Sequence, residues 1–171
     1  MRSLPFVLFL ALSLVACGGS DSSDPSTSES TTNETTEQTA GSDEVDRTVT
    51  IQPRGNEMKY RQTEFTVEPG QTIQIVFENT ATSPSMQHNV VVLNSTDDAV
   101  FERVGEAGMR AGSSNEYVPE DDAIIAATDM AAPGETVSVT FTVPEETGDY
   151  GYVCTFPGHW ATMQGTMKVR S

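Results

Sequence analysis

The stretch CTFPGHWATM, residues 154–163, places three side chains that bind transition metals within ten positions. They are a thiol, an imidazole and a thioether, from Cys154, His159 and Met163. The Pro157-Gly158 pair lies between the thiol and the imidazole, and such a pair favours a tight turn. The sequence therefore predicts a loop whose turn brings the imidazole back toward the thiol.

Period-two alternation of polar and apolar residues surrounds this loop, which indicates β-strands. The expected strands cover 46–52, 58–67, 71–79, 88–93, 135–143, 150–156 and 165–169. Segment 88–93, HNVVVL, is nearly all apolar, as is typical of a strand buried on both faces, and its Val90 and Val92 share a face with His88. Six or seven short strands favour an all-β fold, a Greek-key β-sandwich of antiparallel strands.

One segment between the strands has a different period. Residues 97–112 carry Val100, Phe101 and Val104 at helix-like spacing, and Asp97 or Asp98 is suited to the N-terminal cap. We expect a short helical flap outside the sheets.

The chain begins with features of export. Residues 1–16 combine Arg2 with an apolar run that is too short for a stable membrane span, which predicts a signal peptide. The following Leu-Val-Ala-Cys, 14–17, resembles the bacterial lipoprotein box, in which Cys17 becomes the lipid-modified first residue. The alternative is an ordinary signal peptide that is cut nearby and leaves Cys17 as a free thiol.

Residues 17–45 are rich in Ser, Thr, Gly and acidic residues, and they lack aromatic residues. Such a composition cannot bury enough apolar surface to offset its ordering entropy, so we expect a flexible, lipid-anchored tether. The remaining residues, 46–171, are enough for one domain with a hydrophobic core.

Charge excludes one class of partner. The chain has 25 acidic and 9 basic residues and a formal net charge of −16, which makes nucleic acid an unsuitable partner. The acidic surplus could steer a cationic redox partner. It could equally serve solubility or life in salt, which the presence of only two lysines, Lys59 and Lys168, favours.

Cysteine usage points to a metal. The chain has two cysteines, and if Cys17 carries lipid, Cys154 has no disulfide partner in an exported protein. A free thiol in that setting needs a chemical reason, and ligation of a metal is one.

The chain has two histidines, His88 in an expected core strand and His159 in the loop. A single histidine is usually a hydrogen-bonded polar group and seldom a ligand. Taken together, however, the two imidazoles, the thiol of Cys154 and the thioether of Met163 are the donor set of a blue-copper centre.

These residues give the chain a resemblance to the cupredoxins, and within them to azurins and auracyanins. Three segments carry the resemblance: MQHNVV (86–91), YVCTFPGH (152–159), with Met163 and Gly165-Thr166 after it, and GMRAGSSNEYVPEDDAIIAAT (108–128). The first resembles the segment of the first ligand, the second the azurin ligand loop, and the third the azurin flap. The resemblance covers nearly all of residues 46–171.

The resemblance implies a single copper ion that cycles between Cu(I) and Cu(II). His88, Cys154 and His159 would form its trigonal plane and Met163 its long axial bond. The backbone carbonyl of Gln87 would lie opposite, where azurins have a glycine.

Two further residues would support this site. Asn89 would join the two ligand segments, and the amide of Phe156 would point at the sulfur of Cys154. Azurins also have a disulfide that this chain cannot form, so lipid-anchored auracyanins are the closer comparison.

Electrons would enter through an apolar patch around the imidazole of the loop. Its candidate residues are Met86, Pro157, Gly158, Trp160 and Ala161. Trp160 could be an exposed docking residue or could pack on the loop. Four other methionines are expected to fill the core: Met58, Met109, Met130 and Met167.

The function that follows is electron transfer without enzymatic activity. We expect a monomer that is held at the periplasmic or cell-surface face of a membrane and exchanges electrons with cytochromes or membrane redox complexes. The alternative is a periplasmic carrier or chaperone that delivers copper.

Overall fold

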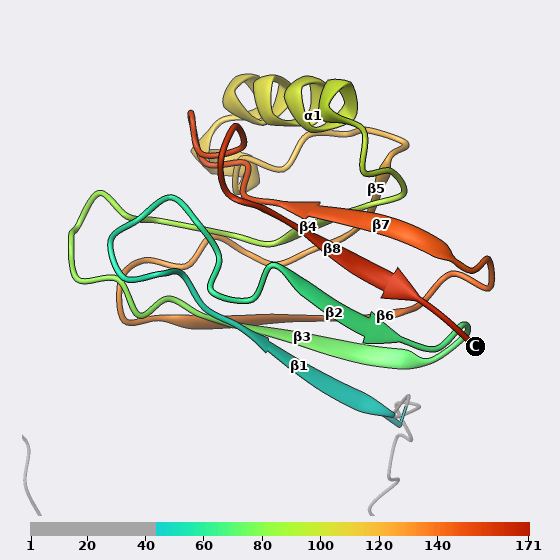
Figure 1. Cartoon of the computed structure of the whole chain (residues 1–171). Helices are drawn as coiled ribbons and strands as arrows, with labels where there is room; N and C mark the ends of the chain where they lie inside the picture. Colours follow the sequence, from blue (N-terminus) through green and yellow to red (C-terminus); the bar gives the residue numbers. More distant parts are fainter. Residues whose placement is uncertain (1–43) are drawn as a thin grey trace, which may run out of the picture. The chain divides into compact units, whose positions relative to one another are not determined.

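The computed structural model describes residues 44–171, so the predicted signal peptide, Cys17 and most of the tether lie outside the described residues (Figure 1). The described chain forms eight strands, one α-helix and one short 3₁₀ helix. The strands are β1 (Arg47–Ile51), β2 (Glu64–Val67), β3 (Thr72–Glu78), β4 (Val91–Leu93), β5 (Ile124–Ala127), β6 (Thr136–Thr142), β7 (Gly148–Val153) and β8 (Gln164–Val169). The helices are α1 (Asp98–Ala111) and η1 (Ser113–Asn115).

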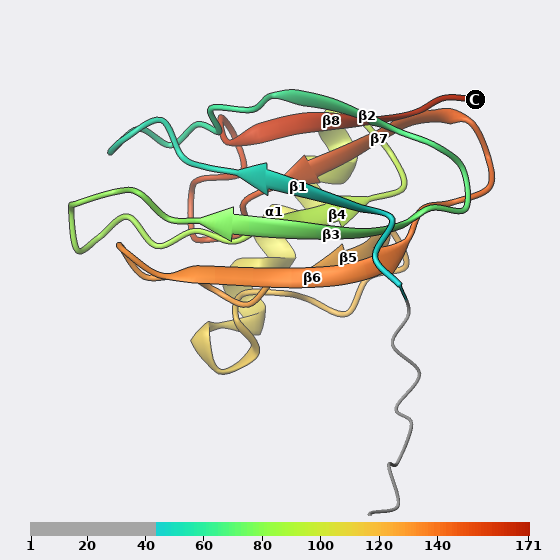
Figure 2. The ribbon, with the colours of Figure 1, turned by 90° about the horizontal axis from the view of Figure 1, so that it is seen from below.

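The strands form two sheets that face each other, which confirms the predicted β-sandwich (Figures 1 and 2). One sheet has the order β1-β3-β6 and the other the order β2-β8-β7-β4-β5. The expectation that all strands are antiparallel is wrong, because β1 pairs parallel to β3 and β2 pairs parallel to β8. β2, which lies between β1 and β3 in the sequence, belongs to the other sheet. The chain therefore leaves the first sheet after β1 and re-enters it as β3, which runs in the same direction as β1.

The core between the sheets follows the alternation of the sequence. Along β3, Ile73, Ile75 and Phe77 are fully buried, and the residues between them are half-buried. β4 is buried on both faces, as its apolar run predicted. Val92 belongs to the cluster between the sheets, whereas Leu93 belongs to a second cluster beneath α1.

The observed strands differ from the expected ones in three main places. Of 58–67, only the last four residues form a strand, and Tyr60 pairs with Pro53 in an isolated bridge. β5 was not expected, because its four residues are all half-buried and show no alternation. His88 precedes β4 and pairs with Ala131 in a second isolated bridge.

Helix α1 lies on the outer face of the five-stranded sheet, as the flap prediction required (Figure 1). Phe101 and Val104 are buried there. Asp97 occupies the N-cap position, but its side chain makes no capping hydrogen bond.

The methionines separate into two groups. Met167 is buried in the core, as expected, and Met130 is half-buried. The expectation is wrong for Met58, which lies in the loop between β1 and β2, and for Met109, which lies beside the buried face of α1. Their exposed fractions are 42% and 46%.

Gly165 in β8 permits the packing of a buried tyrosine. A Cβ at this position would lie 2.1 Å from Cζ of Tyr152, whose ring is held between Tyr60 and Phe65. We expect Gly165→Ala to lower the free energy of unfolding by about 1–3 kcal/mol, as overpacking does. Denaturant unfolding measures the loss. Gly148→Ala is the control, because its nearest neighbour would lie at an ordinary 3.6 Å; equal losses in both variants would contradict this explanation.

Candidate metal centre

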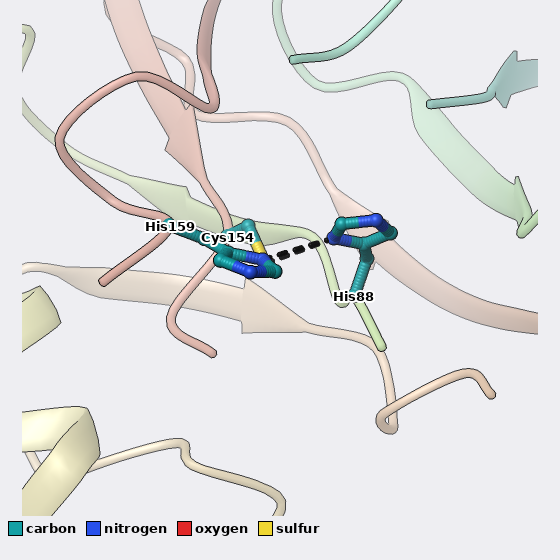
Figure 3. Close-up of side chains that lie close together, drawn as sticks. All are labelled: His88, Cys154 and His159. Carbon is teal, nitrogen blue, oxygen red and sulfur yellow. Dashed lines mark hydrogen bonds between the residues drawn. The ribbon is translucent and has the colours of Figure 1, made fainter. Parts of the chain in front are cut away.

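The structure brings three donor atoms from two distant segments together in one buried cluster. Nδ1 of His88 lies 3.1 Å from Nδ1 of His159, and Sγ of Cys154 lies 3.8 Å and 3.7 Å from these two nitrogens. Figure 3 shows both imidazoles and the thiol facing one another. The three residues are at most 4% exposed.

The size of this triangle suits a transition-metal ion. A point equidistant from the three atoms lies about 2 Å from each, close to the bonds of about 2.0–2.3 Å that imidazole nitrogen and thiolate sulfur form with such metals. Two imidazoles and a thiolate in a trigonal arrangement are typical of copper. The cluster therefore fits the predicted copper ion.

His88 is held by its backbone and by a buried amide. Its N–H donates to the carbonyl of Ala131, and the N–H of Ala131 donates back to its carbonyl, at 3.1 and 2.8 Å. Nδ2 of Asn79 donates to the carbonyls of Ala131 and Met86, at 2.9 and 2.8 Å. Asn79 thus fixes both segments that position His88.

The loop 154–163 closes on itself beyond the end of β7. The amide of Cys154 donates to the carbonyl of Met163, and the amide of Met163 donates to the carbonyl of His159, at 3.0 and 2.8 Å. Gly158 adopts a φ of 80°, which lets the turn reverse at low steric cost. These bonds hold the Cys154 and His159 segments in a fixed relation.

Asn89 joins the two ligand segments. Its Oδ1 accepts from the amide of Thr155 at 2.9 Å, and its Nδ2 donates to the hydroxyl of the same residue at 2.9 Å. The hydroxyl of buried Tyr60 donates to the carbonyl of Asn89 at 2.6 Å. The residue after His88 is therefore bonded to the residue after Cys154.

Burial decides the ionisation of the donors. Burial, together with the neighbouring His159, lowers the pKa of His88 to about 4, and burial also lowers the pKa of His159. Both imidazoles are therefore neutral near pH 7 and able to bind a metal. Nε2 of His88 is buried without a hydrogen-bond partner among the described residues.

Burial raises the pKa of the Cys154 thiol to about 12, although the backbone amides of Asn89 and Phe156 lower it. Without a cation the thiol stays protonated near neutral pH. A bound metal ion favours the thiolate, because metal ligation requires the deprotonated sulfur.

The other predicted site residues differ in exposure. Met163 is fully buried, and Gln87 is half-buried. Of the five patch candidates, three are exposed and two are half-buried. The exposed ones are Pro157, Gly158 and Ala161, and the half-buried ones are Met86 and Trp160. Trp160 packs against the cluster beneath α1.

Two supporting residues were not found from the sequence. Asn79 is the last residue of one expected strand, and Tyr60 lies within another. At both positions the sequence pattern indicated a strand but no role at the metal site. Their roles depend on partners far along the chain. The only local sign of a supporting role for Asn79 is that it is a polar residue at the end of a buried strand.

We expect Asn79→Ala to lower the free energy of unfolding by about 1–3 kcal/mol, because it leaves the buried carbonyl of Ala131 and the part-buried carbonyl of Met86 without this donor. Thermal or denaturant unfolding measures the change. Asn94→Ala is the matched control, since the exposed side chain of Asn94 makes one long hydrogen bond of 3.3 Å, to the carbonyl of Asp122. A loss at Asn79 no larger than at Asn94 would argue against this role.

Comparisons with known proteins agree with this geometry. Residues 47–170 match the family described as copper binding proteins of the plastocyanin/azurin family. The chain is 38% identical over 170 residues to auracyanin-A of Chloroflexus aurantiacus, covering 99% of this chain and 96% of that protein. It is 41% identical to azurin of Alcaligenes faecalis over 103 residues, covering 58% and 78% of the two proteins.

A solved structure gives the same result for the fold. Auracyanin A, a "blue" copper protein from the green thermophilic photosynthetic bacterium Chloroflexus aurantiacus, matches with a TM-score of 0.67 and 40% identity. The match covers 72% of this chain and 98% of that one.

Proposed function

Because this chain belongs to the plastocyanin/azurin family of copper-binding proteins, we propose that it is a blue-copper protein that carries single electrons. The observation that carries this function is the convergence of His88, Cys154 and His159 on one buried point. The chain binds one copper ion, whose chemical contribution is the change between Cu(I) and Cu(II).

We assign the four ligands by combining this convergence with the donor set. The two histidines and Cys154 would hold the ion through two imidazole nitrogens and a thiolate sulfur, and Met163 would offer a thioether sulfur. The carbonyl of Gln87 is the candidate for a fifth contact. Imidazole favours Cu(II), whereas thiolate and thioether favour Cu(I), so these four donors together suit both oxidation states of the ion.

The protein keeps these ligands in place when the charge of the site changes. The bridge between His88 and Ala131, the bonds of Asn89 and the backbone bonds of the loop hold the donors at fixed positions. Core packing at crystal-like density resists rearrangement. Small movement on oxidation or reduction favours fast electron transfer.

Electron entry is proposed at the loop beside His159, which is 4% exposed. The surrounding exposed residues are Pro157, Gly158 and Ala161, with Met86 and Trp160 partly covered. A small surface of this kind suits the brief complexes that electron carriers form.

Redox proteins are the proposed partners, in particular cytochromes or membrane electron-transport complexes, and the proposed state is a monomer. The net charge of −16 favours cationic partners. Association that depends on this charge slows as salt concentration rises, because salt screens exposed charges.

Export and attachment through a lipid on Cys17 are proposed from the sequence. The apolar start of the chain and the Leu-Val-Ala-Cys sequence support this location at a periplasmic or cell-surface membrane face. Within residues 44–171, no helix has the length and apolar character needed to cross a membrane.

We assign no enzymatic role, because one copper ion uses both histidines of the chain. The alternative of a copper carrier receives no support from this site. A carrier needs donors that exchange their ion readily, whereas the three donors here are buried and held by hydrogen bonds.

Optical and paramagnetic spectra of the copper-loaded full chain test this function. We expect an intense visible thiolate-to-copper band that disappears on adding a reductant and returns on reoxidation. Reaction with a cationic cytochrome should give the same loss or gain of colour. A colourless oxidised protein, or one that releases its copper readily to a partner, would favour the carrier.

A further inference from the structure

Helix α1 approaches the loop 154–163 through glycines on its buried face. Gly105 and Gly108 are both buried. A Cβ at Gly105 would lie 2.2 Å from Cγ and 2.6 Å from Cβ of Trp160, closer than real Cβ contacts. Rotation of the indole cannot relieve the second contact, because the Cβ of Trp160 is fixed to its backbone. The helix therefore touches the ligand loop directly.

Gly108 makes a second close approach one turn along the helix. A Cβ there would lie 2.6 Å from the carbonyl oxygen of Tyr117 and 3.0 Å from Cβ of Thr155. Thr155 follows Cys154 and is bonded to Asn89. Because Gly108 has no side chain, the helix can pack closely against both the segment after it and the ligand loop.

The segment after α1 completes this contact. Glu116 and Tyr117 adopt positive φ angles of 53° and 55°, which are uncommon for residues other than glycine. The carbonyl of Glu116 accepts from Nδ2 of Asn89 at 3.2 Å, and the ring of Tyr117 packs edge-on against Phe156. Contacts with both ligand segments accompany this unusual backbone.

These contacts meet the ligand loop beside its ligands. Thr155 and Phe156 follow Cys154, and Trp160 follows His159. Figure 1 shows α1 lying next to the loop that joins β7 and β8. The helix and the segment after it, residues 98–117, are called the helical clamp below.

We propose that the helical clamp is a positioning element of the copper centre. Gly105 and Gly108 allow the close approach that holds Cys154 and His159 in their relative positions. This inference rests on the proposed function, since it gives the clamp a role at the proposed copper site. Without such a role, α1 would only cover the cluster that contains Phe101 and Val104.

The two roles predict different results for the same substitutions. Alanine has a higher helix propensity than glycine, so a helix that only covers the core gains from the change unless it collides with a neighbour. A collision alone would alter the unfolding of the protein but not the copper spectrum. A positioning role requires the copper spectrum to change in protein that is still folded.

The test uses copper-loaded full chains of Gly105→Ala and Gly108→Ala. We expect altered intensities of the thiolate-to-copper bands and an altered copper hyperfine splitting. We also expect copper affinity, measured by competition with a chelator, to fall at least about tenfold, as when other outer-shell partners of a metal site are lost. Glu106→Ala is the control, because this exposed residue lies on the same helix between the two glycines.

A second background isolates the contact with Trp160. Trp160→Gly removes the three atoms nearest to a Cβ at position 105, because all three belong to the Trp160 side chain. Adding Gly105→Ala to Trp160→Gly should therefore leave the copper spectrum as it is in Trp160→Gly alone. An equal change from Gly105→Ala in both backgrounds would overturn the proposed contact. If Gly105→Ala fails to fold, Trp160→Gly alone decides the question. Copper loss that is faster than in wild type supports the clamp, and copper loss at the wild-type rate overturns it.

Metal-free protein provides a readout that does not depend on copper. Amide hydrogen exchange in residues 154–163 should be faster in Gly105→Ala and Gly108→Ala than in Glu106→Ala. Unchanged exchange together with unchanged copper spectra would overturn the inference. A wild-type chain that binds no copper would instead contradict the proposed function, while the exchange rates would still decide the role of the clamp.

Discussion

Replacing Cys154 with Ser is expected to remove the intense visible colour of the copper-loaded protein while its β-sandwich stays folded. The colour requires a thiolate bound to copper, and Cys154 is the only cysteine among the described residues. A serine hydroxyl has nearly the same shape, and the amides of Asn89 and Phe156 that face the sulfur can donate to its oxygen. We therefore expect a loss in the free energy of unfolding of at most about 3 kcal/mol.

Absorption spectra and circular dichroism of the same samples measure these two effects. Cys17→Ser is the matched control, because it removes the other thiol of the chain and should leave the colour intact. Colour that survives in Cys154→Ser, or that disappears in Cys17→Ser, would refute the ligand assignment.

Asn89→Ala is expected to weaken both the fold and the site. It removes the acceptor of the Thr155 amide and the donor to the carbonyl of Glu116. A buried amide without a partner costs about 1–3 kcal/mol in stability. Loss of a group that holds metal ligands in place usually lowers metal affinity by about 10–100-fold.

Chelator competition and denaturant unfolding measure the two losses. Asn115→Ala is the control, because the exposed side chain of Asn115 makes one long hydrogen bond of 3.3 Å, to the carbonyl of Ala111. Copper affinity that stays within twofold of wild type in Asn89→Ala would contradict the view that this residue joins the ligand segments.

Local patterns in the sequence predicted much of the fold. Alternation placed β3, β6 and β8 close to their observed ranges, and the spacing of Val100, Phe101 and Val104 predicted α1. Strand direction does not change alternation, so the parallel pairs of β1 with β3 and β2 with β8 were not foreseen. β5 was missed because none of its side chains is either fully buried or fully exposed.

The donors were easier to predict than their supports. Cys154, His159 and Met163 lie within one short loop, and His88 is the only other histidine. By contrast, Asn79 acts on Ala131, which lies 52 residues further along the chain. The role of Gly105 likewise depends on Trp160. Such contacts become visible only when the packing of the chain is known.

The central claim is that a rigid set of side chains from two distant segments holds one copper ion in both of its charge states. X-ray absorption at the copper edge, recorded on oxidised and reduced samples of the full chain, tests it most directly. We predict two nitrogen neighbours and one short sulfur neighbour, with nearly unchanged distances after reduction. A shell without short sulfur, or the loss of a nitrogen neighbour on reduction, would contradict the account.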